Sequence, residues 1–317
     1  MSETTRLAPP AVEHGPDVFG ATADDRFEDA LAERQGAPGS RGPVFRFFAF
    51  LVRRPFLLGA SVWILAVLVA AIAPGIFPTQ DPLGGDPIDK LQGPNLGHWF
   101  GTDQLGRDLF ARVLHGTGLT LGAALLAVGI GLVVGSVLGL LAGFVGSWVD
   151  TVVMRIADVL LAIPSLLLSL ALITVLGFGT VHVAIAVGLA SIATVARIMR
   201  SEVVRVRTSV YVEAAQASGN RWWRVLLVHV LPNSAGPVLV LAALEFGTAI
   251  LAVSSLSFLG YGAQPPTPEW GSLVSTGRDF LRTAWWLTTA PGIVIALTVL
   301  SANRVSRALD TEGRRSR

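Results

Sequence analysis

The chain has no cysteine, only one lysine and only two tyrosines among its 317 residues. The absence of cysteine excludes disulfides, thiolate metal sites and cysteine nucleophiles. The lysine, Lys90, lies between Asp89 and Leu91. A phosphate-binding P-loop needs its lysine in the pattern GxxxxGK followed by serine or threonine, and Lys90 does not fit this pattern. The chain therefore cannot hydrolyse ATP through a P-loop of its own.

Other catalytic patterns are missing as well. The sequence holds neither the HExxH pattern of zinc peptidases nor the GxSxG pattern of serine hydrolases. Its histidines are dispersed along the chain: His14, His98, His115, His182 and His229. We therefore predict that the chain is not an enzyme, and that it has no catalytic residue, no bound cofactor and no metal site.

Charged residues are scarce, at 15% of the chain, whereas 52% of the residues are hydrophobic and the mean hydropathy is +0.60. This composition is typical of a membrane protein. A membrane-spanning helix needs about 20 apolar residues. Six runs qualify, over residues 56–77, 118–144, 153–176, 180–199, 234–259 and 284–303. We predict an all-α, multi-pass membrane protein with six transmembrane helices.

The predicted membrane domain covers residues 46–310, with an external loop over 78–117 and a cytoplasmic loop over 200–233. Residues 1–45 are polar, and the first 40 residues contain eight acidic and three basic side chains. Such a segment cannot bury enough apolar surface to fold alone, so we predict a disordered tail. A short regulatory helix over 24–35 is the alternative. We predict that residues 311–317 form a short cytoplasmic tail.

Basic residues indicate the orientation of the chain. If the amino terminus is cytoplasmic, sixteen arginines lie in inside segments, against five basic residues outside. Because cytoplasmic loops carry the excess of lysine and arginine, we expect both termini in the cytoplasm. The pI of about 9.6 then reflects membrane topology, and we expect lipid and no nucleic acid as a partner.

One stretch, residues 209–232, lies between two long apolar runs but carries Glu213, Arg221 and Arg224. These charges exclude it from hydrocarbon, so it is a loop between membrane helices. Its sequence, SVYVEAAQASGNRWWRVLLVHVLP, begins with helix-favouring residues.

We expect a short helix in this loop, capped by the side chain of Thr208 or Ser209 and stopped by a left-handed Gly219. Small side chains on such a helix would let it enter a groove on another protein. The alternative is an amphipathic helix that lies on the lipid headgroups.

The EAAxxxG core of this loop, with its trailing LP, resembles the loop of permease subunits of ATP-binding-cassette importers. HVLPN, at residues 229–233, is similar to the HILPN of the peptide and nickel branch. The resemblance implies a type I importer permease fold and a coupling helix that docks into an ATPase subunit. The implied coupling residues are Tyr211, Glu213, Ala214, Ala215, Gly219, Arg221, Leu231 and Pro232.

The external loop contains HWFGTDQLGRD at residues 98–108. Asp89, Asp103 and Asp108 with Arg107 could form a metal or substrate site. Because the carboxylates are scattered and the glycines indicate turns, we favour a structural, hydrogen-bonded loop. GTDxxGRD resembles the C-type permease of dipeptide, oligopeptide and nickel importers. The residues concerned are Gly101, Thr102, Asp103, Gly106, Arg107 and Asp108.

The third predicted span opens with Arg155 and Asp158, which share a helix face at a spacing of three residues. We expect them to fix the helix end, or to act as a gate latch. Pro164 should kink this span, because it removes one helical hydrogen bond. The segment resembles the DxxMRxxDxxLAIPxLL pattern of the same permease branch.

Glu245 lies inside the fifth predicted span. A carboxylate within the membrane is costly unless it is paired, protonated or facing water. It could line a translocation path and bind a peptide amino group, or it could be a hydrogen-bonded packing residue. Downstream, LSFLGYGAQPPTPEWG resembles a signature of the branch, although Val253 stands where that family usually has glutamate.

Gly135, Gly139 and Gly143 form a stripe along one face of the second predicted span. Such stripes let helices approach closely. Packing against a partner permease and packing within this chain are both compatible with the pattern.

The resemblance implies a bacterial inner-membrane importer for dipeptides or oligopeptides. Its expected partners are a B-type permease, one or two ATPase subunits that bind ATP and Mg, and an extracytoplasmic substrate-binding protein. The same machinery could import nickel, glutathione or haem. From the residues alone, an ion-coupled secondary transporter and a membrane scaffold are further alternatives, but Glu245 is the only clear candidate for ion coupling.

Overall fold

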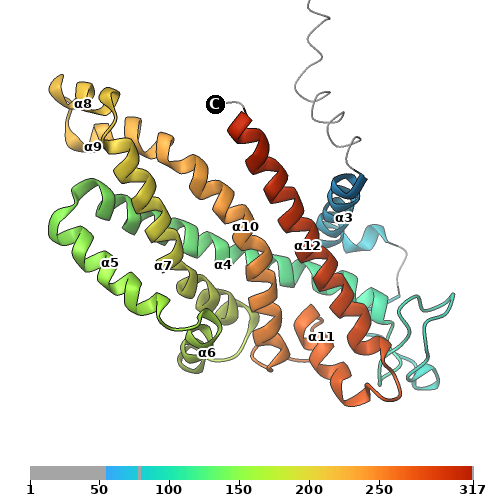
Figure 1. Ribbon diagram of the computed structural model, residues 1–317. Coiled ribbons are helices and arrows are strands. Elements are labelled where there is room, and N and C mark those ends of the chain that lie inside the picture. The colour runs from blue at the N-terminus through green and yellow to red at the C-terminus, as the bar shows by residue number, and fades with distance from the viewer. Residues whose placement is uncertain (1–54, 78–79, 316–317) are drawn as a thin grey trace, which may run out of the picture. The chain divides into compact units, whose positions relative to one another are not determined.

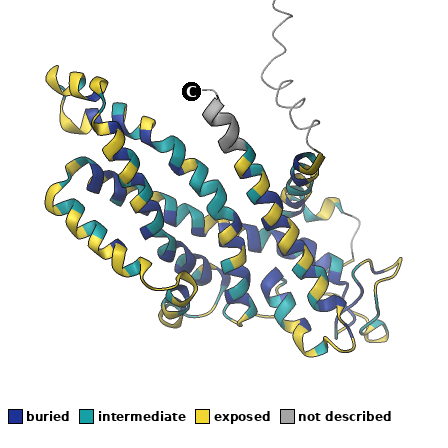
Figure 2. Cartoon of the chain, viewed as in Figure 1, coloured by how far each residue is buried: buried dark blue, intermediate teal, exposed yellow. Residues whose placement is uncertain are grey.

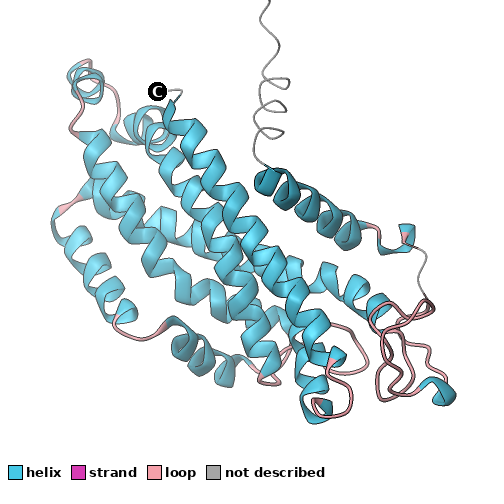
Figure 3. Cartoon of the chain, turned by 45° about the vertical axis from the view of Figure 1, so that its right-hand side comes forward, coloured by secondary structure: helices cyan, strands magenta, loops and turns pink. Residues whose placement is uncertain are grey.

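The computed structural model describes residues 55–77 and 80–315. The predicted amino-terminal tail, including the candidate helix over 24–35, lies outside the described residues. The described part is mostly helical and contains no β-strand, only two isolated bridges in the loop before residue 109 (Figure 3). The predicted all-α class is therefore confirmed.

Within the described residues, five helices are long and apolar enough to cross a membrane. They are α3 (Pro55–Ile72), α4 (Leu109–Val145), α7 (Thr180–Arg207), α10 (Leu231–Phe258) and α12 (Trp286–Arg315). The shorter helices are α5 (Ser147–Leu161), α6 (Ser165–Leu176), α8 (Val210–Ala217), α9 (Trp222–Val225) and α11 (Trp270–Gly277), as shown in Figure 1. The pair α5 and α6 would make the sixth span if it crosses the membrane as one broken unit.

The second span begins nine residues before the predicted boundary at 118, because α4 starts at Leu109. Asp108 caps this helix, and its carboxylate accepts a hydrogen bond from the amide of Ala111 at 2.6 Å. At 37 residues, α4 is roughly 55 Å long, well beyond the ~30 Å hydrocarbon core. The loop that the sequence predicts to be external therefore ends at 108, and the polar residues that suggested a longer loop belong to the first turns of α4.

The third predicted span is not a single kinked helix. It divides into α5 and α6, whose axes differ by 95°. Pro164 occupies the N-cap of α6 in an extended conformation with ψ of 129°. A residue that precedes proline avoids helical angles, so Ile163 cannot continue α5. The expected kink is instead a complete break, visible between α5 and α6 in Figure 1.

The glycine stripe of α4 packs against α7 of the same chain, which answers the question that the pattern left open. A Cβ atom added at Gly139 would lie 2.3 Å from the carbonyl oxygen of Ala196. One at Gly135 would lie 2.7 Å from Cβ of Val195. These glycines are therefore used for close packing within the chain, as in other membrane helix pairs.

We expect Gly139→Ala to destabilise the protein by about 1–3 kcal/mol, because the added methyl group overpacks the contact between α4 and α7. Gly122→Ala on the same helix is the matched control, since nothing lies within 4 Å of its Cβ position. Because alanine favours helix by about 1 kcal/mol over glycine, the control should be neutral or stabilising. Thermal unfolding in detergent, followed by size-exclusion chromatography, measures both. Equal effects of the two changes would contradict the packing.

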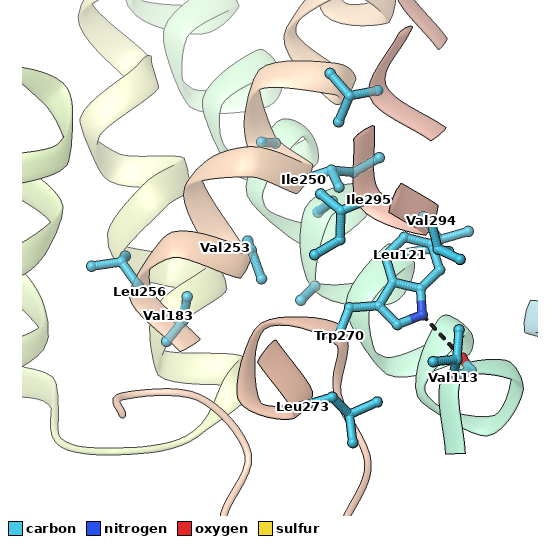
Figure 4. Packing of buried hydrophobic residues seen from close by; sticks show 14 of the residues in the cluster. Val113, Leu121, Val183, Ile250, Val253, Leu256, Trp270, Leu273, Val294 and Ile295 are labelled. Carbon is cyan, nitrogen blue, oxygen red and sulfur yellow. Dashed lines mark hydrogen bonds between the residues drawn. The ribbon is translucent and has the colours of Figure 1, made fainter. Parts of the chain in front are cut away.

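The main apolar core lies where α4, α7, α10, α11 and α12 meet. Trp270 is fully buried there, and its indole Nε1 donates a hydrogen bond to the carbonyl of Val113 at 3.0 Å (Figure 4). Val253 is also fully buried in this cluster. At this position, where the sequence resemblance implies a glutamate, an apolar side chain therefore lies in an apolar environment.

Candidate functional site

The helix α8 lies directly after the carboxyl end of α7. The other end of α7 contacts the loop after α10, because the amide of Gly179 donates to the carbonyl of Tyr261 at 2.8 Å. A helix of 28 residues is about 42 Å long, which separates these two ends by more than the hydrocarbon thickness. The predicted coupling helix and the loop after α10 are thus at opposite ends of α7 (Figure 1).

The predicted short helix is present, but its start differs from the expectation. Neither Thr208 nor Ser209 caps it with a side chain. The Ser209 hydroxyl donates instead to the carbonyl of Val206 at 2.6 Å, and its extended backbone turns the chain out of α7. The helix ends before Gly219, which has the expected left-handed φ of +77°.

Most of the α8 surface faces solvent (Figure 2). Val212 is the only buried residue of α8, Ala215 is half-buried, and so is Asn220 in the turn after the helix. The predicted coupling residues that lie exposed on α8 and the turn after it are Tyr211, Glu213, Ala214, Gly219 and Arg221. The structure therefore brings these five to one protruding element.

Of the remaining three predicted coupling residues, Ala215 is half-buried on α8, and Leu231 and Pro232 lie in the first turn of α10. They follow a π-helical turn at Leu226–Val230, which joins α9 to α10 in one continuous helical stretch. In a regular α-helix the ring of Pro232 would clash with the carbonyl of Val228, and a π-turn relieves such a clash. The trailing LP of the motif thus shapes the connection between α9 and α10.

A second apolar cluster holds α8 in place. Val212 packs there with buried residues of α4, α7, α9 and α10 and of the π-turn. Its members are Leu140, Val195, Met199, Val203, Val206, Val212, Val225, Leu226, Val230 and Val238. Because cores are close-packed, a displacement of α8 is transmitted to the helices that contribute to this cluster.

A cavity of about 360 Å³ lies between α4, α6, α7 and α10. Glu245 of α10 is its only charged lining residue. The remaining wall is formed by apolar side chains and by serine and threonine hydroxyls, including those of Ser165 and Ser169 on α6. Pro164 does not line this cavity, although its break of the helix places α6 there.

The expected pair of Arg155 and Asp158 is wrong. The carboxylate of Asp158 forms an ion pair with Arg197 of α7 instead. One turn farther along α7, Arg200 binds Asp150 through two hydrogen bonds of 2.7 and 2.6 Å. Such exposed pairs each contribute at most about 1 kcal/mol, but together they fix the orientation of α5 on α7. Arg197, Arg200 and Asp150 could not be found by local spacing, because their partners are 39 and 50 residues away.

In the loop before α4, Asp103 organises a turn. One of its oxygens accepts hydrogen bonds from the amides of Leu105 and Arg107, at 2.8 and 3.0 Å. The other accepts from Nε of Arg107 at 2.7 Å and lies 3.7 Å from Nε of Arg112. Gly106 has φ of +75°, and a Cβ atom there would collide with the carbonyl of Asp86.

The neighbouring residues connect this turn to the helices. Asp108 caps α4 and also contacts His98, with 2.9 Å between Oδ2 and Nδ1. The carbonyl of Thr102 accepts a hydrogen bond from the indole of Trp286 on α12 at 3.2 Å. Among the described residues, no three His, Cys, Asp or Glu side chains form a group that could hold a metal ion. The geometry favours the structural interpretation of the loop.

Sequence reasoning gave no role to Glu269, which is fully buried beside the core. Its carboxylate accepts hydrogen bonds from the hydroxyl of Ser257 at 2.7 Å, the amide of Ala263 at 2.6 Å and the hydroxyl of Thr180 at 3.1 Å. It therefore ties α7, α10 and the loop between α10 and α11 together. The signature that LSFLGYGAQPPTPEWG resembles does not specify the residue at position 269. The only sequence signal for a buried acid here is that Glu269 directly precedes Trp270.

Comparison with known sequences gives a consistent result. The profile of the family described as binding-protein-dependent transport system inner membrane component matches residues 135–314, a range that includes α8 and the cavity-lining helix α10. The dipeptide transport system permease protein DppC of Alkalihalophilus pseudofirmus is 40% identical over 253 residues, covering 80% of this chain and 83% of that protein. The glutathione transport system permease protein GsiD of Pectobacterium atrosepticum is 36% identical over 270 residues, covering 85% and 90%.

A solved structure described as an amino acid ABC transporter with histidines is similar to this chain with a TM-score of 0.50. The match covers 64% of this chain and 94% of that chain at 16% sequence identity. A likeness at this level of identity concerns the fold alone, and it agrees with the importer permease fold expected from the sequence.

Proposed function

Because the chain belongs to the family of binding-protein-dependent transport system inner membrane components, we propose that it forms one half of the path through an ATP-driven importer of dipeptides or oligopeptides. A second permease of similar fold supplies the other half. The observation that carries the proposal is the protruding, solvent-facing α8, which is anchored by one buried side chain at the end of a membrane helix. Such an element is suited to contact a separate protein.

The proposed partner of α8 is an ATPase subunit, which binds ATP and Mg in place of this chain. Closure of two ATPases on ATP would push α8, and Val212 would pass the movement to the cluster formed with α4, α7 and α10. Since those helices also wall the cavity, the movement changes the side from which the cavity is open. This is alternating access, driven by the preference of ATP for one state.

The orientation follows from the same arrangement. If α8 contacts an ATPase, the end of α7 at Arg207 is cytoplasmic, together with both termini. The loop over 80–108 then faces the extracytoplasmic side, where a substrate-binding protein delivers its ligand. The excess of arginine in the cytoplasmic segments supports this orientation.

Peptides are the proposed substrate class because similar permeases carry dipeptide names. Besides the DppC relative, the di/tripeptide transport system permease protein DppC of Pseudomonas aeruginosa is 38% identical over 274 residues. The glutathione permease relative supports glutathione as a second candidate of the same chemical class.

The test is transport by the reconstituted complex. We would purify the chain with its second permease and ATPases, place the complex in liposomes, and measure uptake of a radiolabelled dipeptide in the presence of the binding protein. The expected uptake requires both ATP and the binding protein. Uptake driven by a sodium or proton gradient without ATP would contradict the proposal. Nickel or haem as the ligand that co-purifies with the binding protein would contradict the substrate class alone.

A further inference from the structure

The cavity between α4, α6, α7 and α10 is lined by an acidic group but by no basic group. Its volume, about 360 Å³, lies in the range of small-molecule sites. Much of its wall is apolar and includes Leu132, Leu166, Leu251 and Leu256. The lining includes no arginine, lysine or histidine. The single ionisable group in this wall is the carboxyl group of Glu245.

The hydroxyl hydrogens of this wall are mostly engaged within their own helices. Ser169 donates to the carbonyl of Ser165, and Ser191 to that of Gly188, at 2.9 and 2.8 Å. Ser255 donates to Leu251 at 2.7 Å, and Thr248 donates to the carbonyl of Glu245 at 2.9 Å. Each hydroxyl oxygen keeps free acceptor capacity after donating its hydrogen. The polar side chains therefore present mainly acceptors to a ligand.

Glu245 itself lacks a cationic partner among the described residues. Its side chain is half-buried, and Oε2 of its carboxylate lies 3.2 Å from the Thr248 hydroxyl, whose one hydrogen is shared with the carbonyl of Glu245. A carboxylate inside the membrane costs free energy unless a positive group pairs with it. Asp150 and Asp158 each have an arginine partner, whereas Glu245 has none among the described residues.

We propose that this cavity binds the protonated amino group of a peptide during its passage, with Glu245 as the anionic partner and the hydroxyl oxygens as additional acceptors. An ammonium group has three donors and no acceptor, which matches this wall. A metal ion such as nickel would prefer nitrogen or sulfur ligands, and the cavity offers none from a side chain. The proposal deepens the proposed function and rests on it for the identity of the ligand.

The absence of cysteine permits a direct test, because an introduced thiol is the only one in the chain. We would introduce Thr194→Cys, on the α7 side of the cavity, into the assembled transporter. The rate of thiol modification would be measured with 2-aminoethyl methanethiosulfonate, which carries an ammonium group, and with neutral methyl methanethiosulfonate. Adding Glu245→Gln is expected to lower the modification rate of the ammonium reagent about tenfold, because the negative charge that concentrates cations in the cavity is removed. The modification rate of the neutral reagent should not change.

Glu202→Gln is the matched control, since Glu202 lies on α7 outside the cavity lining and pairs with Arg205. It should leave both modification rates unchanged. The proposal is overturned if Glu245→Gln slows both reagents equally, if it slows neither, or if the thiol at position 194 is inaccessible in every nucleotide state.

A protection experiment separates the possible ligands. A dipeptide amide with a free amino group should slow modification in the presence of Glu245, and the N-acetylated dipeptide amide should not. Protection by sodium chloride but not by choline chloride would assign the cavity to a metal cation and overturn the proposal. If the charge effect and amine protection are present but ATP-dependent peptide uptake is absent, the proposed function fails and the ammonium site stands.

Discussion

Gly219→Val is expected to lower ATP-dependent uptake at least tenfold while the protein still accumulates in the membrane. Gly219 ends α8 with φ of +77°, a conformation that costs a β-branched residue roughly 1–2 kcal/mol or more. Nothing lies within 4 Å of its Cβ position, so the change meets no atom of the core. Its effect should therefore be confined to the end of α8 and the turn that leads to Arg221.

Two variants distinguish this backbone effect from a general surface effect. Gly219→Asn adds a polar side chain but tolerates the left-handed conformation, so most of the uptake should remain. Gly75→Val, at an exposed glycine in the short helical turn after α3, should be neutral, because that glycine has no positive φ and no atom near its Cβ position. Uptake and co-purification of the ATPase would be measured for all three. Equal uptake by the valine and wild-type proteins would contradict the role of α8 in coupling.

Local features of the chain were predictable where a single segment determines its own structure. The coupling helix is an example, since its helix-favouring residues and its terminal Gly219 lie within eleven residues. The break at Pro164 was underestimated because a proline's local effect also depends on whether neighbouring helices support a bent helix. In this chain α6 turns to wall the cavity, which no local pattern indicates.

Polar contacts between distant segments were not predictable. Local spacing predicts that Asp158 pairs with Arg155 on its own helix face, but Asp158 reaches Arg197 because α5 packs on α7. The start of α4 differs from the prediction for a related reason. Arg112 falls within the loop predicted over 78–117, yet its guanidinium is buried and donates to the carbonyl of Pro82 at 3.0 Å. In both cases tertiary packing supplies the partner that the local pattern lacks.

Glu269→Leu is expected to destabilise the protein by about 3 kcal/mol or more and to lower its yield in the membrane. The leucine would leave the amide of Ala263 and the hydroxyls of Ser257 and Thr180 without their acceptor in a buried site. Each buried donor without an acceptor costs roughly 1–3 kcal/mol. The thermal unfolding midpoint in detergent measures the loss.

Glu269→Gln provides the sharper comparison, because it keeps the size of the side chain. Its amide oxygen can still accept the hydrogen bond from the backbone N–H of Ala263, which can only donate. Its NH2 group can donate to the hydroxyl of Ser257, which can rotate to accept. We therefore expect a loss of only about 1 kcal/mol, and Glu202→Leu on α7, at a partly exposed acid, should cost less than Glu269→Leu. If glutamine and leucine at position 269 destabilise equally, the negative charge itself is required, and hydrogen-bond acceptance alone does not explain why a carboxylate is buried between α7 and α10.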